Sequence, residues 1–135
     1  MRKTTMSLLV LLCLWGATSW QGQPQWRVVQ HVVLTRQTAP ISQTTVFTPT
    51  ERGVYRLSAY LSAGGSPQAN WEWSFYWNDL DGVGFQTSLD SSDGPSQVGA
   101  MIFAPQPGVP VTYATTSNPQ PHGGYDLLFT IEQLQ

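Results

Sequence analysis

The sequence has little cysteine and little charge. Its one cysteine, Cys13, lies near the N-terminus, so the rest of the chain forms no disulfide bond and depends on a hydrophobic core. Only 10% of the 135 residues are charged. Beyond residue 19 there are four arginines and eight acidic residues, which gives a formal net charge of −4. That balance excludes a basic patch, so we do not expect a nucleic-acid partner.

The N-terminus has the three parts of an export signal. Arg2 and Lys3 precede an apolar run of about ten residues, which is too short to span a bilayer comfortably. Ala17 and Ser19 have the spacing of small residues that a signal peptidase recognises. We therefore predict a signal peptide at 1–19, a flexible lead at 20–25 and one domain at 26–135, with no membrane insertion after cleavage.

The predicted location is secreted, periplasmic or at the cell surface. A lipid anchor at Cys13 is the alternative, but the residue before it is leucine, where a lipobox requires a small residue. The chain also lacks Asn-x-Ser/Thr acceptors for N-glycosylation. The absence of cysteine pairs and of acceptors favours a bacterial source.

The mature part of the sequence alternates between apolar and polar residues, with no helical periodicity. The clearest alternation runs from Gly53 to Ala63, with apolar side chains on one face. Turn residues separate eight such segments, which predicts an all-β, antiparallel two-sheet sandwich of jelly-roll type. The expected strands are 27–34, 43–48, 53–63, 71–77, 84–91, 96–104, 111–116 and 125–134.

Aromatic residues are concentrated in the segment WEWSFYW. Four of its rings lie in phase, and burying each removes about 150 to 250 Å² from water. We assign these rings, with three others that lie in phase on their own strands, to the core or to a subunit interface; a sugar-binding platform is the alternative. The assigned residues are Tyr55, Trp71, Trp73, Phe75, Trp77, Tyr125 and Phe129.

Metal binding and catalysis have few candidates. Asp79 and Asp81 precede Gly82, which is typical of a hairpin turn, and a calcium site at these two carboxylates is the less favoured alternative. The only histidines are His31 and His122, and no Gly-x-Ser-x-Gly motif is present. We predict that the chain is not an enzyme and needs no cofactor.

Candidate binding residues are those expected at the surface. Tyr60 and Tyr76 lie on the polar faces of their strands, near Arg56 and Glu72 respectively, and His122 lies in a loop rich in proline and glycine. Exposed rings beside a charged group suit a protein partner or a glycan equally well.

The segment FTPTERGVYRLSAYLS resembles the second-strand region of the jelly rolls similar to tumour necrosis factor, which include the globular heads of complement proteins. Phe47, Gly53, Tyr55, Leu57 and Ala59 carry the resemblance. It implies a jelly roll that trimerises, binds partners and has no catalytic activity. The main functional interpretation is therefore an exported structural or protein-interaction module, and the alternative is a small carbohydrate-binding domain that uses exposed aromatic rings.

Overall fold

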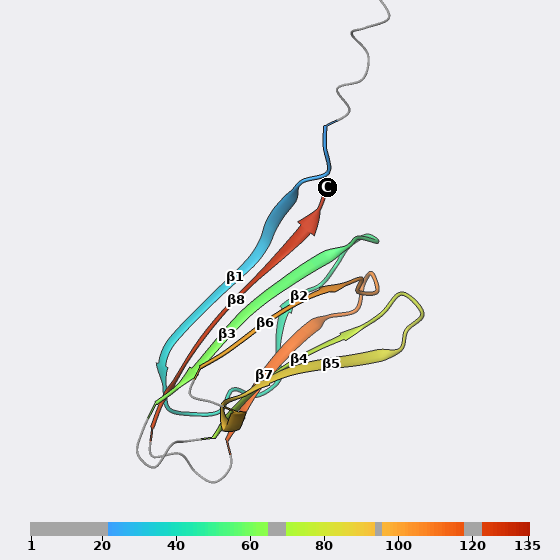
Figure 1. Ribbon diagram of the computed structural model, residues 1–135. Helices are drawn as coiled ribbons and strands as arrows, with labels where there is room; N and C mark the ends of the chain where they lie inside the picture. Colours follow the sequence, from blue (N-terminus) through green and yellow to red (C-terminus); the bar gives the residue numbers. More distant parts are fainter. Residues whose placement is uncertain (1–21, 65–69, 94–95, 118–122) are drawn as a thin grey trace, which may run out of the picture.

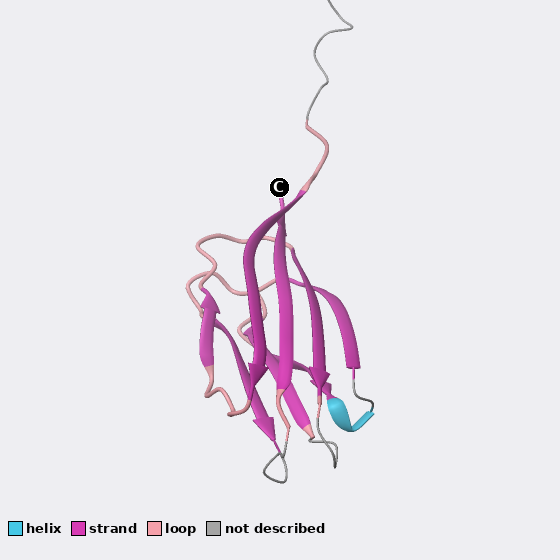
Figure 2. Ribbon diagram, turned by 90° about the vertical axis from the view of Figure 1, so that its left-hand side faces the viewer, coloured by secondary structure: helices cyan, strands magenta, loops and turns pink. Residues whose placement is uncertain are grey.

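Two four-stranded antiparallel sheets pack face to face (Figures 1 and 2). The computed structural model describes residues 22–64, 70–93, 96–117 and 123–135. The predicted signal peptide and His122 lie outside the described residues. Within the described part of the chain, no helix is long and apolar enough to cross a membrane.

Neighbouring strands within each sheet are distant in sequence, except for β4 and β5, which one turn joins. Sheet A contains, in spatial order, β1 (Trp26–Gln37), β8 (Tyr125–Leu134), β3 (Tyr55–Ala63) and β6 (Ser96–Phe103). Sheet B contains β2 (Thr44–Phe47), β7 (Val111–Ser117), β4 (Trp71–Asn78) and β5 (Gly84–Asp90). A short 3₁₀ turn, η1 (Ser91–Asp93), leads from β5 toward β6.

The strand order makes the fold a jelly roll. The antiparallel pairs β4·β5, β3·β6, β2·β7 and β1·β8 are nested around one turn, so the chain folds as a long hairpin wrapped into two layers. The turn is the one that the sequence predicts: the Asp79 carboxylate accepts hydrogen bonds from the backbone N–H groups of Asp81 and Val83, at 3.0 and 2.9 Å. Gly82 adopts a φ of 80° there, which a residue with a Cβ rarely does.

The core lies between the sheets and is largely aromatic. The four in-phase rings of β4 are at most 9% exposed, and they contact rings of sheet A. Trp73 lies 5.5 Å from Phe129, and Phe75 meets Phe103 edge-on at 5.5 Å, both measured between ring centroids. Offset and edge-on contacts of this kind suit aromatic quadrupoles and bring the two layers together.

The eight-stranded sandwich is confirmed, while β1 differs from expectation. The sequence predicts a strand covered on both faces, because both faces are apolar, yet Val28 and Val33 are 55% and 50% exposed. Sheet A is one layer of a two-layer sandwich, so only the inner face of β1 is packed against the other sheet. The last residue of the expected flexible lead, Gln25, is held in place, because it exchanges two backbone hydrogen bonds of 2.9 Å with Gln135.

Candidate functional site

The outer face of sheet B carries polar side chains in register. Cross-strand partners point to the same side of a sheet, so the pairing of β4 with its two neighbours defines three rows. We call this surface face B; its rows are Thr116–Glu72–Asp90, Ala114–Ser74–Ser88 and Thr112–Tyr76–Gln86.

Hydrogen bonds hold the side chains of face B in place. The Ser74 hydroxyl donates to Glu72 Oε1 at 3.1 Å, and Gln86 Nε2 donates to Ser74 Oγ at 3.3 Å. The longer side chains of Glu72 and Gln86 cover Ser74, which is only 6% exposed although it points away from the core. At the sheet edge, Gln43 Nε2 donates to Thr112 Oγ1 at 2.8 Å. The face therefore presents amide, hydroxyl and carboxylate groups with fixed positions.

An open cleft of about 240 Å³ lies at one end of face B. Its six lining residues all carry polar side chains: Asn70, Glu72, Asp90, Ser92, Thr116 and Ser117. Asp90 Oδ1 accepts the backbone N–H of Ser92 at 2.8 Å, which fixes its carboxylate at the start of η1. The cleft suits a hydrophilic ligand that offers several hydroxyl or amine groups.

Tyr76 supplies the ring of face B. It lies four residues along β4 from Glu72, and the strand rise of about 3.3 Å per residue puts roughly 13 Å between their Cα atoms. The ring is partly exposed and is flanked by Thr112 and Gln86. A ligand that spans from the cleft to Tyr76 would therefore meet polar groups along its edge and an aromatic surface at one end.

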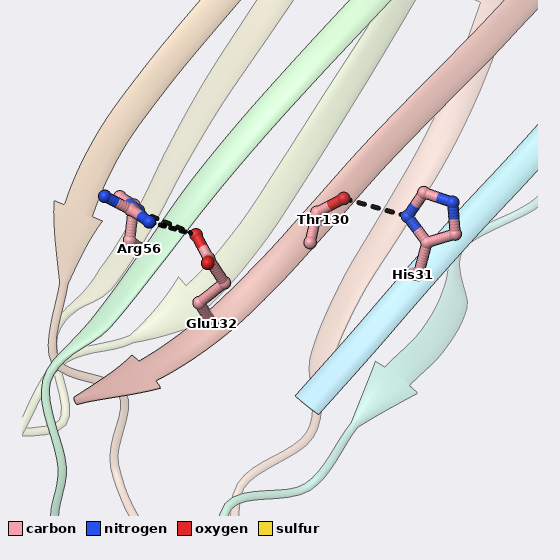
Figure 3. A network of polar contacts seen from close by, with 4 residues as sticks. All are labelled: His31, Arg56, Thr130 and Glu132. Atoms are coloured by element: carbon pink, nitrogen blue, oxygen red, sulfur yellow. Dashed lines mark hydrogen bonds and ion pairs between the residues drawn. The ribbon is translucent and has the colours of Figure 1, made fainter. Parts of the chain in front are cut away.

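The outer face of sheet A, face A, carries the other predicted pair, Tyr60 and Arg56. The Arg56 guanidinium forms an ion pair of 2.6 Å with Glu132 of β8 and lies 4.8 Å from the centre of the Trp26 ring. Figure 3 shows this pair and, on the neighbouring strands, His31 Nδ1 within 2.8 Å of Thr130 Oγ1. Arg56 is therefore engaged within its own sheet.

Tyr60 is the more exposed of the two predicted rings, at 37%. Hydrogen bonds with the hydroxyls of Ser62 and Ser96 lower the pKa of its phenol. Because β3 and β4 belong to different sheets, Tyr60 and Tyr76 lie on opposite surfaces of the sandwich and do not form one site. The structure thus groups Tyr76 with Glu72, and Tyr60 with Arg56.

The other predicted residues have structural positions. The seven aromatic residues assigned to the core or an interface are all buried between the sheets. Asp79 accepts the hydrogen bonds of the β4–β5 turn, and among the described residues no group of three or more Asp, Glu, His or Cys side chains could hold a metal ion. His31 lies on face A, where Thr130 is its hydrogen-bond partner.

The sequence matches no family model and no curated protein. Among solved structures, the CBM22-1 xylan-binding domain of Paenibacillus barcinonensis Xyn10C is 14% identical, covers 85% of this chain and 84% of its own, and gives a TM-score of 0.42. A family 16 carbohydrate-binding module is 12% identical over 86% of each chain, with a TM-score of 0.38. A module from Cellvibrio mixtus lichenase 5A, solved with cellotriose, is 11% identical over 84% of this chain and 88% of its own, with a TM-score of 0.32.

These likenesses concern the β-sandwich fold, and they correct the resemblance drawn from the sequence. The similar structures are carbohydrate-binding modules, not jelly rolls of the tumour-necrosis-factor type. That resemblance is therefore wrong, and the trimer that it implied is unsupported. The main functional interpretation, a structural or protein-interaction module, is wrong for the same reason.

Proposed function

We propose that the chain is a non-catalytic glycan-binding module that holds its ligand across face B. One observation carries the proposal: fixed polar groups and one aromatic ring lie in register on an open sheet surface, beside a cleft of about 240 Å³ lined by polar side chains. An exported protein, as the N-terminal signal predicts, would meet glycans of the cell envelope or of the surroundings.

The chemistry of a pyranose matches this surface. Its hydroxyl groups lie around the ring edge and both donate and accept hydrogen bonds, which suits the Glu72 carboxylate, the Gln86 amide and the Thr116 hydroxyl. Its C–H groups form an apolar face that packs against an aromatic ring such as Tyr76. The solved modules named above include a xylan-binding domain and a complex with cellotriose, whereas the ligand of this chain is inferred from its own residues.

Titration calorimetry with a panel of oligosaccharides tests the proposal, using a matched pair of tyrosine variants. We expect Tyr76→Ala to weaken binding by about two- to tenfold, because it removes a ring contact worth roughly 0.5–1.5 kcal/mol. Tyr60→Ala removes the same side chain from face A and should leave the affinity unchanged.

Two outcomes would contradict the proposal. If the folded wild-type chain binds none of the glycans, the proposed function itself is contradicted. Weaker binding in Tyr60→Ala but not in Tyr76→Ala would place the ligand on face A instead. Circular dichroism of each variant establishes that the fold is retained.

A further inference from the structure

We propose that face B selects glycans by charge: it favours a glycan that carries free amino groups, disfavours its N-acetylated form, and rejects a glycan that carries uronic acid carboxylates. Glu72 and Asp90 are the residues that determine this specificity. The inference rests on the proposed function, because it concerns the ligand of the same face.

Beyond the predicted signal, positive side chains are confined to sheet A and the segment before β3, whereas acidic side chains lie on both sheets. The sequence has no lysine or arginine after Arg56, so β4, β5 and β7 contain none, and β2 is uncharged. The four arginines beyond the predicted signal lie in β1, in β3 or in the segment just before β3: Arg27, Arg36, Arg52 and Arg56. Sheet B therefore offers no cationic side chain to an acidic ligand.

Face A has a carboxylate that is paired with a cation, whereas face B has none among the described residues. On face A, Glu132 is paired with Arg56 at 2.6 Å, while Asp126, like Asp90, accepts one backbone N–H, that of Arg36 at 2.6 Å. On face B, Glu72 and Asp90 are direct cross-strand partners, and like charges in that position repel each other. No cation of the described residues pairs with either of them.

Each of these two carboxylates keeps one oxygen available to a ligand. Glu72 uses Oε1 to accept from Ser74, and Asp90 uses Oδ1 to accept from Ser92. Their second oxygens have no hydrogen bond within the described part of the chain, and both residues line the same cleft. The cleft thus combines two partly free anionic acceptors with the hydroxyls of Thr116 and Ser117.

The ammonium group of an amino sugar complements this cleft. It is compact, carries a full positive charge and donates three hydrogen bonds, and charge-assisted bonds to carboxylates are about twice as strong as neutral ones. N-acetylation removes the charge and two of the donors. A uronate places a third carboxylate beside two others, with no cation to offset the repulsion.

Calorimetry at low salt with four probes of equal length tests the inference. The probes are a glucosamine oligomer, its N-acetylated form, a cello-oligosaccharide and an oligogalacturonate. We expect the glucosamine oligomer to bind about tenfold more tightly than the N-acetylated and neutral probes, and the oligogalacturonate not to bind. In Glu72→Gln/Asp90→Asn, the ratio of the first two affinities should fall to near one.

The control variant is Glu51→Gln, which removes an exposed carboxylate from the segment before β3 and should keep the wild-type ratio. A second measurement needs no variant: raising the salt concentration should reduce the preference for the amino sugar, because salt screens charge attraction at exposed sites. This keeps the inference testable if the double variant does not fold.

The outcomes separate the inference from the function on which it rests. If the wild type binds the neutral probe but shows no preference for the amino sugar, or if the preference survives in the double variant or at high salt, charge selection by these residues is overturned and glycan binding stands. Equal loss of preference in Glu51→Gln would show attraction by net charge alone, which also overturns it. Failure to bind any of the four probes overturns the inference, and it overturns the proposed function only if the oligosaccharide panel also shows no binding.

Discussion

At the scale of single residues, two tryptophans of β4 differ in how their indole N–H groups are satisfied. Trp71 Nε1 donates to the backbone carbonyl of Gly123 at 3.2 Å, whereas Trp73 Nε1 has no hydrogen-bond partner among the described residues. Both side chains are at most 1% exposed. Trp73 also lines a cavity of about 120 Å³ between β5 and β6. A buried donor without a partner costs about 1–3 kcal/mol.

This difference predicts unequal effects of the same substitution. Trp71→Phe and Trp73→Phe remove similar volumes from the core, but only the first also breaks a hydrogen bond. We expect Trp73→Phe to lower the free energy of unfolding by about 1 kcal/mol less than Trp71→Phe does. Urea denaturation of the two variants measures this, and an equal or larger loss in Trp73→Phe would contradict it.

The candidate site shows which single residues can be predicted from a sequence and which cannot. Glu72 and Tyr76 were predicted from the alternation of β4, which is a local signal. Asp90 was not predicted, although the signal existed: counting outward from the Asp79–Gly82 turn along both strands places it opposite Glu72. Asn70, Thr116 and Ser117 could not be found in this way, because they come together only through the pairing of β4 with β7 and the loop at its end.

At the scale of elements, a close contact between β1 and β8 depends on one glycine. A Cβ on Gly124 would lie 2.8 Å from the backbone carbonyl oxygen of Gln37, at the ends of the two paired strands. Backbone atoms cannot rotate away as a side chain can. Alanine at this position would therefore push the two strands apart.

We expect Gly124→Ala to destabilise the fold by about 1–3 kcal/mol, the range of overpacking in tight sites. Gly84→Ala is the matched control, because the nearest atom to its Cβ is 3.8 Å away, an ordinary contact distance. Thermal unfolding followed by circular dichroism compares the two variants. Similar midpoints for both would show that the β1–β8 junction accommodates a methyl group.

The strands were predictable from the sequence. The strand with which each one pairs, and the class of similar proteins, were not. Alternation depends on neighbours along the chain, so it locates a strand, but the sheet to which the strand belongs depends on residues far away. The Gly-x-Tyr pattern led to the wrong resemblance for a related reason. A Cβ on Gly53 would lie 3.1 Å from the Tyr55 ring and 2.9 Å from Gln133 Nε2, so the glycine is explained by local packing and indicates no particular superfamily.

At the scale of the whole molecule, buried tyrosines set the alkaline limit of stability. Burial raises the pKa of Tyr55, Tyr113 and Tyr125; the charge of Glu51 adds to the effect at Tyr55, and a hydrogen bond with Thr115 opposes it at Tyr125. Because the unfolded chain loses these protons near the ordinary pKa of about 10, the folded state binds more protons above that pH. Their contribution to stability is complete below about pH 10 and is lost as the pH rises further.

We therefore expect the chain to unfold above about pH 10, with tyrosinate absorbance and loss of circular dichroism rising together. Tyr60, with its lowered pKa, should ionise before the transition without unfolding the chain. Tyr113→Phe removes one buried phenol and should move the midpoint to higher pH. Ionisation of all five tyrosines in a chain that keeps its fold would refute this prediction.

The nested pairing of strands also determines when the sandwich is completed. The β4–β5 turn closes the shortest loop, and each pair outside it encloses a longer one, up to β1·β8. Loop closure costs more entropy as the loop lengthens, so pairing starts most readily at the turn and proceeds outward. Among the described strands, β1 pairs only with β8 and therefore cannot pair before β8 is present. Folding is consequently slow for a chain of this size, on the scale of milliseconds to seconds, and β1 remains unpaired until β8 has been synthesised.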